Sequence, residues 1–181
     1  NKRVAADKAG RLGGALFRKV KPGGRYFVKQ GKTKAGPVKV LSDRSRPPSK
    51  SIYNQDISPD GYGYMTMRDG TKLAMAVRKP FGNVPPPWPT LIEYSGYGTA
   101  DPAGPESGIA LVGQLLGYAV VDVNMRGTGC SGGAFDFFET LQSLDGYDAI
   151  ETIARQPWVK GKPGMLGISY GGISQLFTAQ T

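Results

Sequence analysis

The sequence predicts an α/β fold, in which a mostly parallel sheet carries helices on both faces. Between residues 90 and 181, segments with buried-strand composition alternate with segments that have helical apolar spacing. This is the βαβ rhythm of parallel sheets. Three polar residues, Tyr97, Arg126 and Ser169, each follow a different expected strand. In such sheets functional groups gather where the strands end, so we expect a site at this edge.

The first expected element is a β-hairpin with its turn at residues 68–71. Residues 62–67 place Tyr62, Tyr64 and Thr66 on one side of an extended chain. In residues 73–77 larger side chains alternate with Ala74 and Ala76, which is the period of a strand. The turn contains Asp69-Gly70, a dipeptide typical of tight hairpins. We therefore expect two antiparallel strands ahead of the parallel part of the sheet.

The next elements follow from apolar runs. Residues 90–94 predict a buried strand, residues 109–116 a short apolar helix that Gly117 ends, and residues 118–123 another strand. Polar residues and glycines come directly after both strands. Strand, helix and strand in this order predict two parallel neighbours joined by a helical crossover.

A longer helix is expected from Leu141 or Leu144 to Gln156, where Pro157 ends it. Acidic side chains favour the start of a helix, and three occur here: Asp145, Asp148 and Glu151. One side of the helix is apolar and is expected to face the sheet: Tyr147, Ile150, Ile153 and Ala154.

The segment Gly164–Gly172 predicts a short strand, a tight turn that carries Ser169, and the start of a helix. Gly167 and Gly171 stand two residues either side of the serine, so we expect a sharp turn with the hydroxyl at its apex. A short apolar run precedes the turn, formed by Met165, Leu166 and Ile168. Residues with the spacing of a buried helix face follow it: Ile173, Leu176 and Phe177. This pattern is the nucleophile elbow of an α/β-hydrolase; the alternative is a glycine turn with an idle serine.

The segment Gly129–Gly133 also matches the G-x-S-x-G pattern, with Ser131 at its centre. The residues after Ser131 are rich in glycine and have no helical period. We therefore expect Ser131 to lie in a structural loop, and Ser169 to be the nucleophile.

The charge of the chain divides into two parts. Residues 1–50 hold 15 Lys and Arg against two Asp, a net charge of +13, whereas residues 51–181 have a net charge of −4. We expect a basic N-terminal unit at residues 1–58, the end of a small β-rich unit with strands near 25–28 and 37–41, and a hydrolase-type unit at residues 59–181. The basic part is either a solvated face or a binding site for a polyanion; it has no recognisable nucleic-acid module.

Composition excludes several classes of site. The chain has no histidine and one cysteine, so it holds no zinc-type ligand set and no internal disulfide, and we expect no metal or cofactor. No apolar run approaches the ~18 residues that a membrane span needs. No signal peptide is visible, so we expect that any leader would precede Asn1. The sequence indicates neither a cellular location nor an oligomeric state.

From about residue 60 to residue 181, the chain resembles the X-Pro dipeptidyl-peptidase-like and cocaine-esterase-like serine hydrolases. The resemblance rests on five blocks in order: the hairpin Met67–Leu73, the strand and turn Leu91–Tyr97, the loop Val121–Gly129, the end of a helix at Gln156–Trp158, and Gly164–Gly172. Five ordered blocks are a more specific signal than one motif.

The resemblance implies an α/β-hydrolase core with Ser169 as the nucleophile of an acyl-enzyme. It also implies two oxyanion donors, the backbone N–H of Tyr170 and the hydroxyl of Tyr97. The alternative for Tyr97 is an aromatic residue at the rim of a turn. The acid and the histidine of the triad are implied to come after Thr181, so we expect this chain to be the N-terminal part of a larger hydrolase and to be inactive alone. Three aspartates precede the nucleophile and are not candidates for the triad acid: Asp122, Asp145 and Asp148.

The function predicted from the sequence is hydrolysis of a small ester, amide or peptide substrate, with X-Pro peptides as one class. The alternative is a noncatalytic pseudoenzyme or surface-interaction protein with a polyanion-binding basic arm. Arg126 is expected to brace its loop rather than to hold substrate. Asp101 and Glu106 follow Tyr97 in the sequence and are candidates to bind a substrate amine, but we expect both to be idle loop carboxylates.

Overall fold

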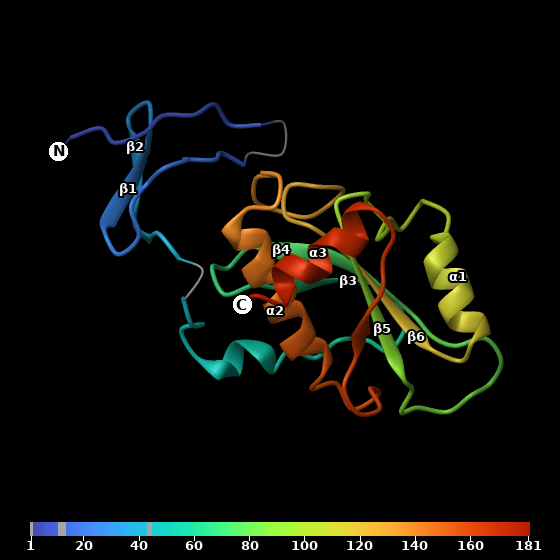
Figure 1. Cartoon of the computed structure of the whole chain (residues 1–181). Coiled ribbons are helices and arrows are strands. Elements are labelled where there is room, and N and C mark those ends of the chain that lie inside the picture. The colour runs from blue at the N-terminus through green and yellow to red at the C-terminus, as the bar shows by residue number, and fades with distance from the viewer. Residues whose placement is uncertain (1, 11–13, 43–44) are drawn as a thin grey trace.

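The computed structural model describes residues 2–10, 14–42 and 45–181. Its main body is a five-stranded sheet with the order β3-β4-β6-β5-β7, flanked by three helices (Figure 1). The strands are β3 (Gly61–Thr66), β4 (Lys72–Arg78), β5 (Thr90–Ser95), β6 (Ala119–Asn124) and β7 (Gly164–Met165). The helices are α1 (Gly108–Leu115), α2 (Thr140–Ile153) and α3 (Tyr170–Thr178).

The sheet combines a parallel and an antiparallel part. Strand β5 pairs in parallel with β6 on one side and with β7 on the other, while β3-β4 and β4-β6 are antiparallel. The predicted α/β class and the βαβ order are therefore confirmed, and the hairpin supplies the antiparallel edge. The hairpin turn forms where expected, with Gly70 at φ 85° and its N–H bonded to the Met67 carbonyl.

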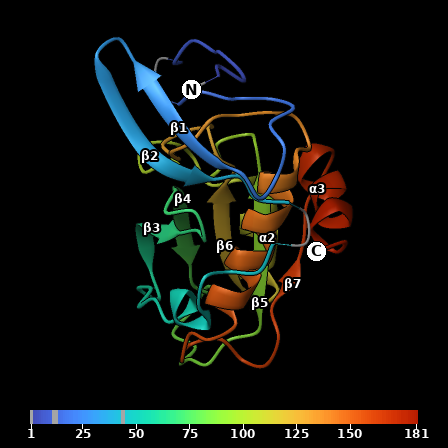
Figure 2. The ribbon, with the colours of Figure 1, turned by 90° about the vertical axis from the view of Figure 1, so that its left-hand side faces the viewer.

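Helices cover both faces of the sheet. Successive side chains of a strand point to opposite faces, so neighbouring strand residues contact different helices. On one face, a Cβ at Gly113 of α1 would lie 2.5 Å from the Val120 side chain, so α1 packs closely there. On the other face, the Tyr94 hydroxyl donates to the carbonyl of Gln142 in α2 at 2.8 Å. This second face, covered by α2 and α3, contains the main apolar core, in which Ile92, Val121 and Val123 are fully buried (Figure 2).

Helix α2 begins at Thr140 and ends at Ile153, three residues before the predicted end at Gln156. Asp145 and Asp148, which we expected to favour the helix start, instead lie within the helix and are fully buried. Their carboxylates pair with buried arginines, so the positive charge of each arginine offsets the desolvation cost of the buried carboxylate. Of the expected apolar side, Ile153 is fully buried while Tyr147, Ile150 and Ala154 are half-buried.

The prediction that the apolar residues after Ser169 form a buried helix face is wrong. Ile173 is 43% exposed and Leu176 67% exposed, and Phe177 is half-buried. Helix α3 instead packs through its small residues, which permit close approach: Gly171, Ser174 and Thr178. A Cβ on Gly146 of α2 would lie 2.3 Å from the Thr178 hydroxyl, which shows how closely the two helices meet.

A separate two-stranded antiparallel ribbon precedes this body. It consists of β1 (Arg25–Gln30) and β2 (Thr33–Lys39), close to the two predicted strands, and it projects from the α/β body in both views (Figures 1 and 2). The 3-10 helix η1 (Lys50–Tyr53) follows. Tyr53 and Ile57 precede the predicted boundary at residue 58, yet both are buried, and Ile57 belongs to the core of the α/β body.

No helix within the described part of the chain is long and apolar enough to cross a membrane.

Candidate active site

Ser169 is the last of the four residues between β7 and α3, and its backbone conformation makes the sharp turn into α3. Its φ of 54° and ψ of −117° lie in a region that residues with a side chain rarely adopt. Such strain persists where surrounding structure holds it and is often found at functional sites. The side chain is exposed and makes no hydrogen bond to the start of α3. The hydroxyl is therefore presented to solvent.

The two glycines of the elbow differ in their structural roles. Neither lies in the left-handed region, so the sharp turn depends on the φ of Ser169 itself rather than on glycine flexibility. A Cβ on Gly167 would lie 2.4 Å from the backbone carbon of Gly171, a distance that no side chain tolerates. A Cβ on Gly171 would make only ordinary contacts, the nearest at 3.6 Å from Ser95. Gly167 thus allows strand and helix to approach each other.

Tyr97 follows β5 and reaches the elbow from the neighbouring strand. Its hydroxyl donates to Ser169 Oγ at 3.1 Å and accepts from the backbone N–H of Tyr170 at 3.3 Å. Ser95 Oγ accepts the Tyr97 N–H at 3.0 Å, which fixes the turn that carries the phenol. Within the described residues, Tyr97 is the one side chain hydrogen-bonded to Ser169 Oγ. The three residues predicted for nucleophile and oxyanion binding therefore lie together.

The environment of the phenol favours its role as a hydrogen-bond donor. In the ionised form, hydrogen bonds that the phenolate accepts from the Ser169 hydroxyl, and then from the Tyr170 N–H, lower the pKa of Tyr97 from its ordinary value. Hydrogen bonds that would stabilise the phenolate also make the neutral phenol a stronger donor. The Tyr97 O–H and the Tyr170 N–H can thus stabilise negative charge that develops beside Ser169.

The ring of Tyr170 is held by contacts that the sequence did not reveal. Its hydroxyl donates to Gln142 Oε1 at 3.0 Å, and the Phe137 ring stacks on it at 5.0 Å. A Cβ on Gly96 would lie 2.5 Å from the Tyr170 ring, so this turn needs glycine. Gln142 carries no motif signal, because it was only a polar residue near a helix start. These contacts fix the backbone N–H of Tyr170.

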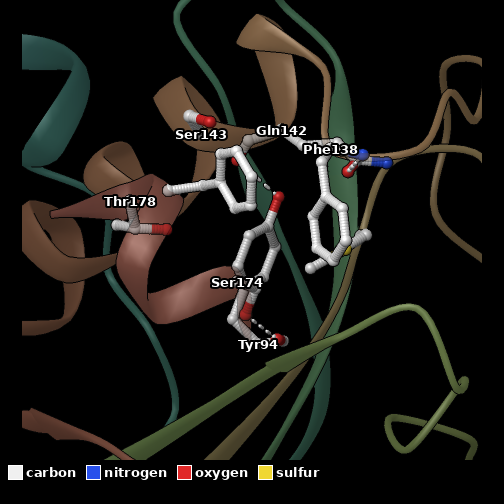
Figure 3. Close-up of a pocket in the computed structure, with 8 residues that line it drawn as sticks. Tyr94, Phe138, Gln142, Ser143, Ser174 and Thr178 are labelled. Carbon is white, nitrogen blue, oxygen red and sulfur yellow. Dashed lines mark hydrogen bonds between the residues drawn. The ribbon is translucent and has the colours of Figure 1, made fainter. Parts of the chain in front are cut away.

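A small, half-open gap lies between β5, α2 and α3 (Figure 3). Two hydrogen bonds cross it, from the Tyr94 hydroxyl to the Gln142 carbonyl and from the Ser174 hydroxyl to the Tyr94 carbonyl. Phe138 and Thr178 also line it. Ser169 does not line this gap, which therefore belongs to the packing of α2 against α3 rather than to the candidate site.

Ser131, at the centre of the other G-x-S-x-G match, is a buried structural residue. It is 2% exposed, accepts the Ala74 N–H at 2.9 Å and donates to the Asn124 carbonyl at 2.7 Å. The hydroxyl thus acts as both hydrogen-bond acceptor and donor, and it connects β4 with the end of β6. This agrees with the structural loop that the sequence predicted.

Arg126 binds protein carboxylates. Its guanidinium makes two bonds to Asp145, at 2.6 and 2.7 Å, and one to Asp69 at 2.9 Å. It is 4% exposed, so no face of it is open to a substrate. Arg68 pairs in the same bidentate way with Asp148. These two buried pairs connect the hairpin and the loop after β6 to α2, which is a bracing role.

The remaining carboxylates of the prediction also have protein partners. Glu106 bonds Arg78 at 3.0 Å and Gln114 at 2.8 Å, and Asp101 accepts the backbone N–H of Ala103 at 2.9 Å. Asp122 bonds Arg78 at 2.9 Å on the sheet face that α1 covers. None of these carboxylates is hydrogen-bonded to Ser169 among the described residues.

The sequence is similar to a family of known hydrolases and to individual esterases. The family model for X-Pro dipeptidyl-peptidase (S15 family) matches residues 69–181. A Mycobacterium bovis protein named as a serine esterase is 31% identical over 129 residues, covering 61% of this chain and 20% of the relative. Cocaine esterase from a Rhodococcus species is 33% identical over 111 residues, covering 60% of this chain and 19% of the relative. The chain thus spans about a fifth of the length of these relatives.

Solved structures show the same architecture. The crystal structure of a CocE/NonD family hydrolase from Staphylococcus aureus matches with a TM-score of 0.57 and 27% identity, over 66% of this chain and 24% of that one. An α/β serine hydrolase from Xanthomonas campestris matches with a TM-score of 0.52 and 23% identity, over 69% of this chain and 58% of that one, which concerns the fold alone. With the family model covering more than half of its residues, the chain belongs to the X-Pro dipeptidyl-peptidase (S15) family.

Proposed function

We propose that this chain carries the nucleophile and the oxyanion site of a serine hydrolase that cleaves ester or amide bonds. The observation that carries the proposal is the meeting of three groups: an exposed serine hydroxyl on a strained turn, a phenol 3.1 Å away and the next backbone N–H. The names of its relatives point to two substrate classes, esters and peptides with proline in the second position.

In the proposed reaction, Ser169 Oγ attacks the carbonyl carbon of the substrate, and its proton passes to a base. The C=O bond becomes a single bond, and the resulting oxyanion accepts hydrogen bonds from the Tyr97 O–H and the Tyr170 N–H. The tetrahedral intermediate collapses when the leaving alcohol or amine takes the proton. Water then attacks the acyl-enzyme in the same way and releases the acid.

The base is proposed to come from outside these 181 residues. The sequence has no histidine, and a serine hydroxyl is a weak nucleophile until a neighbouring base accepts its proton. Tyr97 donates to Ser169 and does not act as that base. On this proposal, the 181-residue chain alone forms the elbow and does not turn over substrate at an enzymatic rate.

A fluorophosphonate probe tests the proposal, because it reacts only with an activated serine. The probe is applied to the longest natural protein that contains this sequence, and the labelled residue is identified by mass spectrometry. We expect labelling at Ser169, its loss in Ser169→Ala and its retention in Ser131→Ala. Labelling that survives Ser169→Ala would assign the nucleophile elsewhere, and an unlabelled natural protein would favour the pseudoenzyme.

A further inference from the structure

The β1-β2 ribbon places like charges opposite each other. In its register Arg25 faces Lys39, and Lys29 faces Lys34. Directly opposite like charges destabilise an antiparallel pair. The ribbon therefore carries an electrostatic cost that the rest of its sequence does not remove.

These cations lie on one face of the ribbon together with an aromatic ring. Side chains alternate along β1, so Arg25, Phe27 and Lys29 point to the same side. The Lys34 ammonium lies 4.0 Å above the centre of the Phe27 ring, which places Lys34 on this side as well. We call this surface, formed by Arg25, Phe27, Lys29, Lys34 and Lys39, the cationic face.

The cationic face has no neutralising partner within the described residues. Residues 18–41 contain eight Lys and Arg and no Asp or Glu. Of these eight, Arg18 alone forms a salt bridge with the described part of the chain, to Asp136 at 2.7 Å. Every residue of β2 is exposed, and the ribbon projects away from the sheet (Figure 2). An external anion would convert the repulsion between these cations into attraction.

We propose that the cationic face binds an anionic polysaccharide. The face is extended, because Arg25 and Lys29 are separated by roughly 13 Å at the usual strand rise of ~3.3 Å per residue. A single small anion does not cover that span, whereas a linear polymer with repeated sulfate or carboxylate groups does. Lysines act as mobile point charges and suit such an array without a fixed geometry.

Two other polyanions fit the face less well. Base stacking needs an open aromatic face, and the Phe27 ring already has the Lys34 ammonium above it. A bilayer surface favours several apolar residues beside the cations, whereas the cationic face has only Phe27. The half-exposed Val28 and Val38 lie on the opposite side of the ribbon, with Tyr26. The surface lies outside residues 69–181, which match the family model, and is independent of the proposed hydrolysis.

The test measures binding of the 181-residue chain to heparin, a sulfated polysaccharide, by calorimetry at several salt concentrations. The variant Lys29→Glu/Lys34→Glu is compared with Lys160→Glu/Lys162→Glu, which makes the same charge change at exposed positions near β7. We expect the ribbon variant to bind at least about tenfold more weakly, and the control to change binding by less than about twofold. Equal losses in both variants would overturn the proposal, because net charge alone would then explain binding.

Two comparison ligands separate the polymer classes. Single-stranded polythymidylate and vesicles of phosphatidylserine with phosphatidylcholine are titrated at the same salt concentration. Tighter binding of either one than of heparin would reject the polysaccharide assignment. Binding of heparin that does not weaken as salt rises would reject the electrostatic argument itself.

A single substitution separates binding from folding. Lys29→Glu turns the like-charged pair with Lys34 into an opposite-charged pair, so we expect the ribbon to resist proteolysis at least as well as the wild type while heparin affinity falls. A variant that binds as tightly as the wild type contradicts the proposal. Fluorophosphonate labelling of Ser169 does not depend on this result, so the two proposals fail separately.

Discussion

The Tyr97 hydroxyl lies 3.1 Å from Ser169 Oγ, although 72 residues separate the two in the sequence. The same oxygen accepts the Tyr170 N–H, so one phenol contacts both the Ser169 hydroxyl and the backbone N–H of the next residue. This arrangement follows from the parallel pairing of β5 with β7, which brings the turns after both strands to one edge. Substitutions at these residues can therefore measure what each group contributes to activity and stability.

Tyr97→Phe removes the phenolic donor and keeps the ring. In the natural protein that contains this chain, we expect kcat/KM for an ester substrate to fall by about 10²–10³, which corresponds to the loss of one oxyanion donor. Stability should change little, because Tyr97 is 62% exposed. Tyr64→Phe, which removes another exposed phenol, is the control. An unchanged kcat/KM in Tyr97→Phe would show that the phenol is only a rim residue.

Ser169→Gly removes the strain of a side chain at φ 54° and also removes the hydroxyl that we propose as the nucleophile. We expect the free energy of unfolding to rise by about 1 kcal/mol while fluorophosphonate labelling disappears. Denaturant titration of the 181-residue chain measures the first effect. Ser143→Gly in α2 is the comparison, because glycine within a helix is expected to destabilise by about 1 kcal/mol. A destabilised Ser169→Gly would contradict the assignment of strain to this turn.

Gly167→Ala and Gly171→Ala form a matched pair on the two sides of Ser169. The new methyl at residue 167 would lie 2.4 Å from backbone, whereas that at residue 171 finds its nearest neighbour at 3.6 Å. We expect Gly167→Ala to lower the free energy of unfolding by about 1–3 kcal/mol and to reduce labelling of Ser169. Gly171→Ala should be close to neutral. Equal effects in both variants would contradict the expected close contact at residue 167, because the turn would then have moved to accommodate the new methyl group.

Ser131→Ala tests the separation between the two G-x-S-x-G segments. The substitution leaves the Ala74 N–H and the Asn124 carbonyl without their buried partner. We expect the free energy of unfolding to fall by about 1–3 kcal/mol, with Ser169 labelling of the folded protein unchanged. Thermal unfolding and labelling of the same sample check both parts. Loss of labelling in a fully folded variant would contradict the structural role.

Asp122→Asn tests a buried carboxyl on the α1 side of the sheet. Burial raises the pKa of Asp122 to about 7, and the carboxyl of Glu93, its register partner on β5, adds to the rise, against the bond from Arg78. Glu106 also faces this group through Arg78. The folded state thus holds a proton that the unfolded state releases near pH 4, so the contribution of Asp122 to stability is lost as pH rises from about 4 to about 7.

We therefore expect the variant to gain stability relative to the wild type across that pH window and to keep a constant difference above it. Denaturant titrations at pH 4.5, 6 and 8 measure the difference. Asp60→Asn, at an exposed site paired with Lys79, serves as the control. A difference that stays flat over this range would show that Asp122 is ionised throughout.

The sequence by itself determined the order of elements from the hairpin to α3 and the position of the turn that carries Ser169. Both depend on local signals, namely apolar periodicity, the Asp69-Gly70 turn and glycines around a serine. These signals lie within one segment, so they do not need the rest of the fold. Even so, periodicity failed for α3, because Ile173 and Leu176 have helical apolar spacing but are exposed in the described structure.

Only the tertiary structure decided how residues from different segments meet. The contact of Tyr97 with Ser169, the anchoring of Tyr170 by Gln142 and the burial of Asp145 against Arg126 each join residues far apart in the chain. The pairing of Lys29 with Lys34 likewise depends on strand register. Spacing along one segment carries no information on such pairs, because they are set by which strands pair and by how closely the helices pack on them.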